Sequence, residues 1–188
     1  DVCSSDLKAR VHLARISSAQ GVALVAQAKR DGLPVTCDVS INSLHLCDVD
    51  MGYFDSRMRL NPPLRQQSDR DALRAGLANG TIDALVSDHT PVDDDAKALP
   101  FAESEPGATG LELLLSLTLK WCQESGVPLV QGLGRITCAA GHLLGGEHEL
   151  EAADWLDSLQ QLKANEAGQN LSVQLKVAPS HTVPTVSV

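Results

Sequence analysis

The alternation of short apolar runs with amphipathic segments constrains the fold of this chain more than any other feature. The amphipathic segments repeat apolar residues at helical spacing and carry helix-ending signals, as at Ser18, Gly32 and Gly80. The expected elements are strand 10–17, helix 18–32, strand 33–40, helix 68–80 capped by Ser68, strand 81–89, and helices 109–126 and 132–146. Strands alternating with helices predict an α/β fold with a parallel sheet, and strands this apolar should be buried on both faces.

Polar side chains gather where the predicted strands end. They are Ser17, Asp38, Asn42, Asp88 and His89. In parallel α/β folds, chemistry takes place at this carboxyl edge of the sheet. Residues 60–65 must form a loop because they contain two consecutive prolines. Residues 92–108 form a long polar loop, a type that is usually a functional lid or disordered; its acidic run 93–95 could bind cations, but a solvated loop is the preferred interpretation.

Composition excludes several classes of partner. The 188 residues carry 15 Lys and Arg against 24 Asp and Glu, a formal net charge of −9, so neither a nucleic acid nor an anionic membrane is an expected partner. No apolar run approaches the ~20 residues that span a bilayer. The five cysteines are odd in number and form no C-x-x-C pair, which favours reduced thiols in a cytoplasmic protein; Cys122 and Cys138 are expected in the core.

Four segments together resemble a known family. They read "ISSAQGVALVAQAKRDGLPVTCDVS", "LNPPLR", "DRDALRAGLANGTIDALVSDHTP" and "EPGATGLELLLSLTL". Their order and spacing are similar to the second half of a dihydroorotase, and the likeness runs over residues 10–145. The resemblance implies about half of a (β/α)₈ barrel of the metal-dependent amidohydrolase type. On it, Leu113, Leu114 and Leu117 should pack against the barrel.

The resemblance also implies a metal site that this sequence does not preserve. Family members place a histidine before "VST" after one strand and a histidine pair after the next. Here the first position is Arg15, and the second pair is Asn42 and Ser43. Arginine has no lone pair to offer a metal, and asparagine is at best a weak oxygen ligand. A later family histidine is replaced by Val92. No metal cofactor is therefore expected.

Other family positions are kept. Asp88 matches the catalytic aspartate that ends the last strand, and Asn61 matches an asparagine that contacts substrate. Pro106, Gly107 and Gly110 match the substrate loop. The resemblance thus assigns Asp88 as the catalytic position, which it implies is inactive, and Asn61, Pro106 and Gly107 as the substrate-binding positions.

Arg15 is expected to fill the space of the missing metal and to pair with Asp88 or Asp38. Asp88 and His89 could instead be a metal pair, although a structural role with hydrogen bonds at the strand end is the preferred interpretation. His12 falls on a structural position of the family and is not counted as a substitute ligand.

The two ends of the chain do not follow the family pattern. Residues 1–9 are interpreted as a non-native leader, and residues 146–188 as a divergent or non-native tail that could begin with an amphipathic helix. Further family ligands, a His-x-His motif and a bridging lysine, belong to strands upstream of this region.

Two functions follow from the resemblance. The first is an inactive dihydroorotase-like protein of pyrimidine biosynthesis that holds the catalytic subunit of aspartate transcarbamoylase in a cytoplasmic hetero-oligomer. The alternative is an active zinc-dependent dihydroorotase, or a related cyclic amidohydrolase, with ligands from the missing half. Whether the chain is an enzyme stays open at this point, with a non-enzyme preferred.

Overall fold

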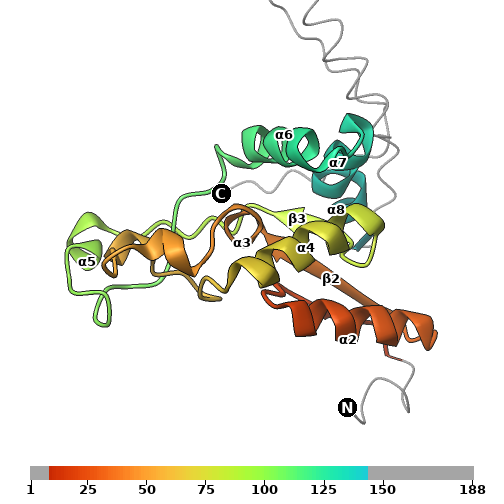
Figure 1. The fold of residues 1–188 in the computed structure, drawn as a ribbon, viewed down its shortest axis with the longest axis horizontal. Helices are drawn as coiled ribbons and strands as arrows, with labels where there is room; N and C mark the ends of the chain where they lie inside the picture. The colour runs from red at the N-terminus through yellow and green to blue at the C-terminus, as the bar shows by residue number, and fades with distance from the viewer. Residues whose placement is uncertain (1–8, 144–188) are drawn as a thin grey trace, which may run out of the picture.

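A computed structural model describes residues 9–143 of the chain (Figure 1). The predicted tail 146–188, with its possible amphipathic helix, lies outside the described residues. So does the predicted leader 1–9 except for its last residue.

Three parallel strands form the sheet. They are β1 (Val11–Leu13), β2 (Val35–Ser40) and β3 (Ala84–Val86), in the order β1-β2-β3. Val11 is in register with Val35, and Asp38 with Ala84. The predicted α/β class and parallel pairing are confirmed, and each crossover passes through helices, as parallel strands require.

The expectation of buried strands holds for the centre of the sheet and fails at one edge. The last four residues of β2 are buried. The first predicted strand, 10–17, is only three residues long as β1, and Leu13 is 42% exposed. Among the described residues, β1 pairs with β2 alone, so one of its edges has no neighbour to cover it.

Helices α2 (Ala19–Arg30) and α4 (Gln67–Asn79) pack against each other. Ser18 caps α2 as predicted: its hydroxyl accepts the Gly21 N–H at 3.1 Å. The predicted cap of α4 is wrong, because the extended residue before the helix is Gln66 and Ser68 lies inside the first turn. Gly80, with φ of 88°, ends α4 in the left-handed conformation.

Three further helices contact the strands: α3 (Ile41–His45) lies against β2, and α7 (Leu129–Ile136) and α8 (Cys138–Leu143) lie against β3. Helix α6 (Leu114–Ser125) packs on α3 and α7. The single helix predicted over 132–146 is two helices, because Thr137 has non-helical φ and ψ of −123° and −93° and its hydroxyl donates to the Leu133 carbonyl at 2.8 Å. Leu114 and Leu117 pack on the core as expected, whereas Leu113 is 49% exposed.

The core lies between the sheet and these helices. Its largest fully buried side chains come from four helices, two strands and the connection between α4 and β3: Trp121, Ile41, Leu44, Leu73, Leu77, Ile82, Leu85, Val25 and Val39. Cys122 is buried as predicted, and Cys138 is only half-buried. Over residues 9–143, none of the helices has the length and hydropathy to span a bilayer.

Two connections fold together into an arm that points away from the core. One holds the 3₁₀ helices η1 (Asp48–Met51) and η2 (Ser56–Met58), and the other holds α5 (Asp94–Lys97). Figure 1 shows α5 and the orange segment before α4 side by side at the left end of the molecule. The predicted polar loop 92–108 is therefore built into this arm and contains one turn of helix.

Candidate functional site

A small pocket lies where the arm joins the carboxyl ends of the strands. Its volume is about 100 Å³, and its lining residues are Arg15, Leu60, Asn61, Asp88, Thr90, Pro106, Gly107 and Ala108. The structure therefore brings together Asp88 and the three predicted substrate positions Asn61, Pro106 and Gly107, with Arg15, from distant parts of the sequence. Asn42 and Val92 do not line it.

The guanidinium of Arg15 forms part of the lining of this pocket and connects two other lining residues. Its Nη1 donates to Asp88 Oδ1 at 2.9 Å and to the Asn61 carbonyl at 3.1 Å. The backbone N–H of Arg15 donates to Asp38 Oδ1 at 2.7 Å. The predicted pairing of Arg15 with a carboxylate is confirmed. Its side chain pairs with Asp88, whereas Asp38 accepts a hydrogen bond from its backbone N–H.

Both residues of this ion pair have an unusual backbone conformation. Arg15 has φ of 54° and Asp88 has φ of 50°, in the left-handed region that residues other than glycine seldom occupy. Such conformations cost about 1–3 kcal/mol each and persist only where the surroundings enforce them. The sequence carries no sign of this, because neither position is a glycine.

Asp38 links the pocket to the edge of the sheet. The carboxylate is buried, and its Oδ2 accepts the Nε2–H of His12 at 2.9 Å. The other ring nitrogen of His12 lies 2.9 Å from the Thr36 hydroxyl. Both nitrogens are thus engaged, as expected of a structural histidine. The His12–Asp38 contact was not predicted from the sequence. A signal for it was present, because His12 and Asp38 are polar residues within the apolar runs of two neighbouring strands.

His89 points to the glycine-containing loop and not to Asp88. Its Nδ1 accepts the backbone N–H groups of Gly110 and Leu111 at 3.2 and 3.3 Å. This geometry matches the predicted structural role at the strand end. It leaves Nδ1 engaged, so a metal pair with Asp88 would need the other ring nitrogen.

The retained glycines let the loop press against the end of β3. A Cβ atom at Gly107 would lie 2.5 Å from the Thr90 carbonyl oxygen, and one at Gly110 would lie 2.3 Å from that of Ser87. Real Cβ atoms do not approach oxygen so closely. Gly107 also has φ of 151°. The close approach explains physically why these two positions carry no side chain.

The side chains at this edge do not fit a divalent metal ion. A guanidinium occupies the position of the family's first histidine, and it would repel a cation. Asn42 offers a buried amide nitrogen that has no hydrogen-bond partner, and this group cannot coordinate a metal. Among residues 9–143, no three His, Cys, Asp or Glu side chains are grouped as a metal site would need.

Curated proteins similar to this chain carry dihydroorotase names. A "Dihydroorotase-like protein" of Pseudomonas aeruginosa is 44% identical over 128 residues, 68% of this chain and 30% of that protein. One of Pseudomonas putida is 37% identical over 180 residues, 93% of this chain and 42% of that protein. A "Dihydroorotase" of Citrifermentans bemidjiense is 37% identical over 137 residues, covering 73% and 32% of the two chains.

Solved structures give the same picture of the fold. An L-hydantoinase of Arthrobacter aurescens matches with a TM-score of 0.67 and 28% identity over 76% of this chain and 32% of its own. A dihydroorotase of Saccharomyces cerevisiae matches with a TM-score of 0.66 and 14% identity over 76% and 40% of the two chains. No family model matches the sequence.

The chain spans roughly 30–42% of the length of these curated relatives. The curated relatives show the family, and the solved structures show the architecture. This chain belongs to the dihydroorotase family, and its described residues form part of a (β/α)₈ barrel of the amidohydrolase type.

Proposed function

We propose that this chain belongs to a catalytically inactive dihydroorotase-like protein whose role in pyrimidine biosynthesis is structural. The observation that carries the proposal is the Arg15–Asp88 ion pair of 2.9 Å. Asp88 is the family's catalytic position, and a permanent cation of the protein itself already neutralises it.

The chemistry of this pair opposes hydrolysis in two ways. Asp88 Oδ1 already accepts the Nη1–H of Arg15, so only the remaining lone pairs of this carboxylate could accept a proton from a water. Hydrolysis of a ring amide also needs an activated water, which a divalent metal supplies in metal-dependent enzymes. Arg15 cannot act as a Lewis acid in this way, because its positive charge is spread over nitrogens that have no empty orbital to accept a lone pair.

The proposed partner is the catalytic subunit of aspartate transcarbamoylase, in a cytoplasmic hetero-oligomer. Support comes from the resemblance to non-catalytic dihydroorotase-like proteins at Arg15 and Asn42. Buried, reduced thiols at Cys37, Cys47 and Cys122 are consistent with a cytoplasmic location.

An active zinc-dependent dihydroorotase, or a related cyclic amidohydrolase, is the second candidate. It is favoured by one observation: Asp88, Asn61 and Gly107 meet in a single pocket, as an intact substrate site would need. Zinc would then have to bind through residues other than those at Arg15 and Asn42.

One experiment separates the two. The full-length protein to which this chain belongs is assayed for zinc by elemental analysis, for dihydroorotate hydrolysis, and for complex formation with the transcarbamoylase subunit by sedimentation velocity. A stable complex without turnover, even in added zinc, supports the structural role. Turnover together with one or two equivalents of zinc contradicts it. The variant Arg15→His serves as a probe of the site: if it alone bound zinc stoichiometrically, the remaining residues would still form a metal site and the proposal would fail.

A further inference from the structure

The arm ends in a cluster of exposed apolar side chains. This aromatic tip consists of the exposed side chains of Val49, Tyr53 and Phe54 together with Phe101, which is half-buried and contacts Phe54. The relative exposure is 76% for Val49, 105% for Tyr53 and 68% for Phe54. The tip contains the only tyrosine and both phenylalanines of the 188 residues. The two exposed rings, Tyr53 and Phe54, therefore lie outside the core.

The backbone holds the tip outward. Phe54 has φ of 59° and follows Gly52, which has φ of 53°. A left-handed conformation is uncommon for a bulky residue and is a local strain. The Phe54 ring meets the Phe101 ring edge-on, with centroids 5.6 Å apart. This contact joins the two connections of the arm and orients the exposed ring.

Hydrogen bonds make the arm rigid behind the tip. Lys97 Nζ donates to the carbonyls of Ser56 and Arg59 at 3.2 and 3.1 Å, and the Ser56 hydroxyl donates to the Lys97 carbonyl. Arg59 Nη1 donates to the Phe101 carbonyl at 2.7 Å. Burial lowers the pKa of Lys97, as expected for an ammonium group that donates hydrogen bonds inside the arm. A rigid surface loses little conformational entropy when it binds.

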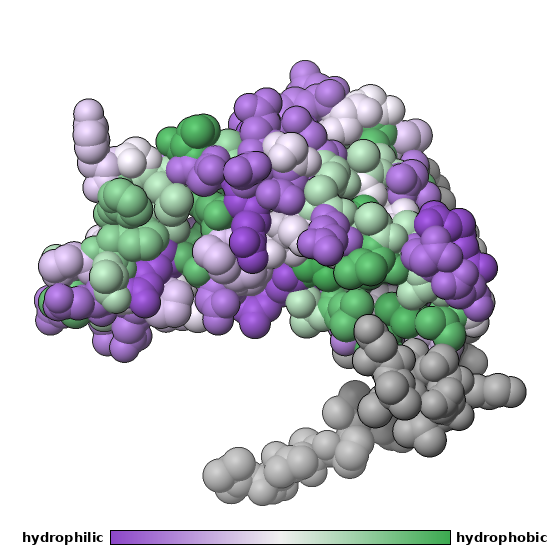
Figure 2. Space-filling view, turned by 60° about the horizontal axis from the view of Figure 1, so that its bottom comes forward, coloured by the Kyte–Doolittle hydropathy of each residue, from purple (hydrophilic) through white to green (hydrophobic). Residues whose placement is uncertain are grey.

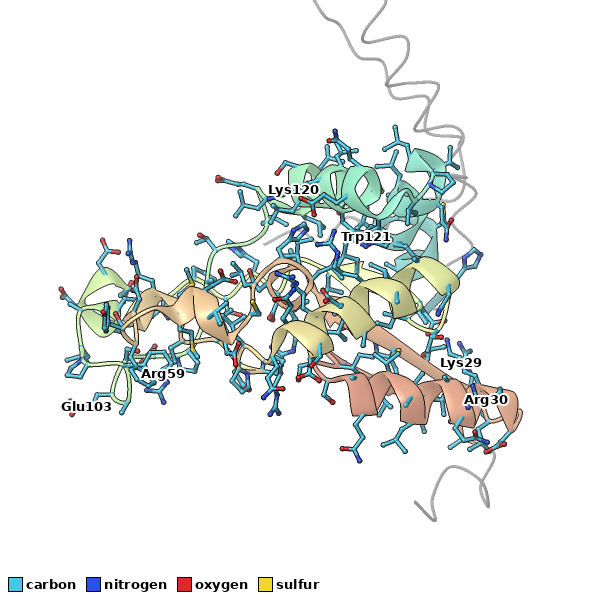
Figure 3. All side chains as sticks on the ribbon, in the orientation of Figure 1. Lys29, Arg30, Arg59, Glu103, Lys120 and Trp121 are labelled. Carbon is cyan, nitrogen blue, oxygen red and sulfur yellow. The ribbon has the colours of Figure 1, made fainter. Side chains whose placement is uncertain are left out.

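The surroundings of the tip are acidic. Residues 48–59 and 93–105 contain eight Asp and Glu and three Lys and Arg. The cations are largely occupied: Lys97 by carbonyls, and Arg57 by the Asp55 carboxylate at 2.6 Å. Figure 2 shows apolar green beside polar purple over the left-hand part of the molecule, where Figure 3 labels Arg59 and Glu103. A second copy of this acidic arm, or an anionic membrane, would be repelled.

We propose that the aromatic tip is a docking surface for a protein partner that offers an apolar pocket rimmed by Lys and Arg. Exposed, rigid aromatic side chains are the residues that dominate binding energy in protein interfaces, and complementary charge around them gives orientation and rate. The inference rests on the proposed function, because it names the surface through which the transcarbamoylase subunit binds.

The test uses the catalytic subunit of aspartate transcarbamoylase as the probe and isothermal titration calorimetry as the measurement. The variant Tyr53→Ala/Phe54→Asn removes both exposed rings and leaves at position 54 a residue that tolerates positive φ. The expected result is a Kd raised at least about 30-fold, and a wild-type Kd that rises with salt. Leu24→Ala on α2 is the matched control, since Leu24 is 64% exposed and lies outside the arm; it should bind as wild type does.

A second variant guards against misfolding. Val49→Lys places on the tip a charge of the same sign as the proposed rim, without removing either ring of the Phe54–Phe101 contact, and it should also weaken binding. If both variants fold and bind as wild type does, the docking inference is overturned and the proposed function stands. If the wild-type protein does not bind the subunit at all, the inference and the proposed partner fail together.

Discussion

Removing the cation from the pocket should destabilise the protein by leaving the Asp88 carboxylate without its partner. The change is Arg15→Met, which keeps an apolar stem and deletes the guanidinium. Nη1 of Arg15 bridges Asp88 Oδ1 and the Asn61 carbonyl, so both acceptors lose a donor. A matched control is Arg30→Met on α2, where the guanidinium bonds only to Gln27 in the same helix turn.

The exposure of the two side chains sets the magnitude. Asp88 is 9% exposed and Arg15 is 42% exposed. Fully exposed pairs contribute about 0.2–1 kcal/mol, and breaking a fully buried pair costs about 3–5 kcal/mol. Because one partner is buried and the other is half in water, the expected loss is about 1–3 kcal/mol. The control should lose less than about 0.5 kcal/mol.

The assay is urea unfolding of wild type, Arg15→Met, Asp88→Asn and the double variant. If the two residues interact as the structure shows, the free energies of unfolding will be non-additive by about 1–2 kcal/mol. Additivity within about 0.3 kcal/mol would refute the reasoning. Arg15→Lys should recover only part of the loss: its ammonium can donate to both of the acceptors that Nη1 bridges, but it stands on a shorter side chain.

Three further predictions concern the described core. Gly132→Ala would put a Cβ 2.1 Å from the Cys122 sulfur and should cost about 1–3 kcal/mol in thermal or urea unfolding; adding Cys122→Ala should relieve part of that cost, and simple additivity would count against the contact. Burial and the neighbouring Asp83 carboxylate raise the pKa of Cys37 to about 11, so iodoacetamide at pH 8.5 should alkylate it far more slowly in the folded protein than in urea, as mass spectrometry can follow. Burial lowers the pKa of His45, so below about pH 6.5 the unfolded chain binds more protons than the folded one and stability should fall on acidification; His45→Gln should flatten that part of the pH–stability curve, and an unchanged curve would contradict the assignment.

Local chemistry made parts of the structure predictable. Ser18 could be assigned as a cap, and Gly80 as a helix end, because each acts through backbone groups only a few residues away. The pairing of Arg15 with a carboxylate was predictable too, since a guanidinium near two strand-end aspartates must find a partner. The parallel sheet followed from the alternation of element types.

Features that depend on distant residues could not be predicted. The exposure of Leu13 depends on which strand lies beside β1. The fixed conformation of loop 92–108 depends on Lys97, whose ammonium bonds to carbonyls roughly 40 residues earlier in the chain. The split between α7 and α8 is a local feature that was also missed: the Thr137 hydroxyl donates to the Leu133 carbonyl, but threonine makes this bond inside continuous helices too, so the sequence does not mark position 137 as a break.

The Arg15–Asp88 pair also constrains how such a site could evolve. Replacing Arg15 by histidine would free the Asp88 carboxylate and the Asn61 carbonyl at once, while position 42 would still supply an amide. If the site is inactive as proposed, the first step toward a metal site would thus cost stability without completing a ligand set. Two or more positions would have to change together, so the ion pair would tend to keep the site in its present state.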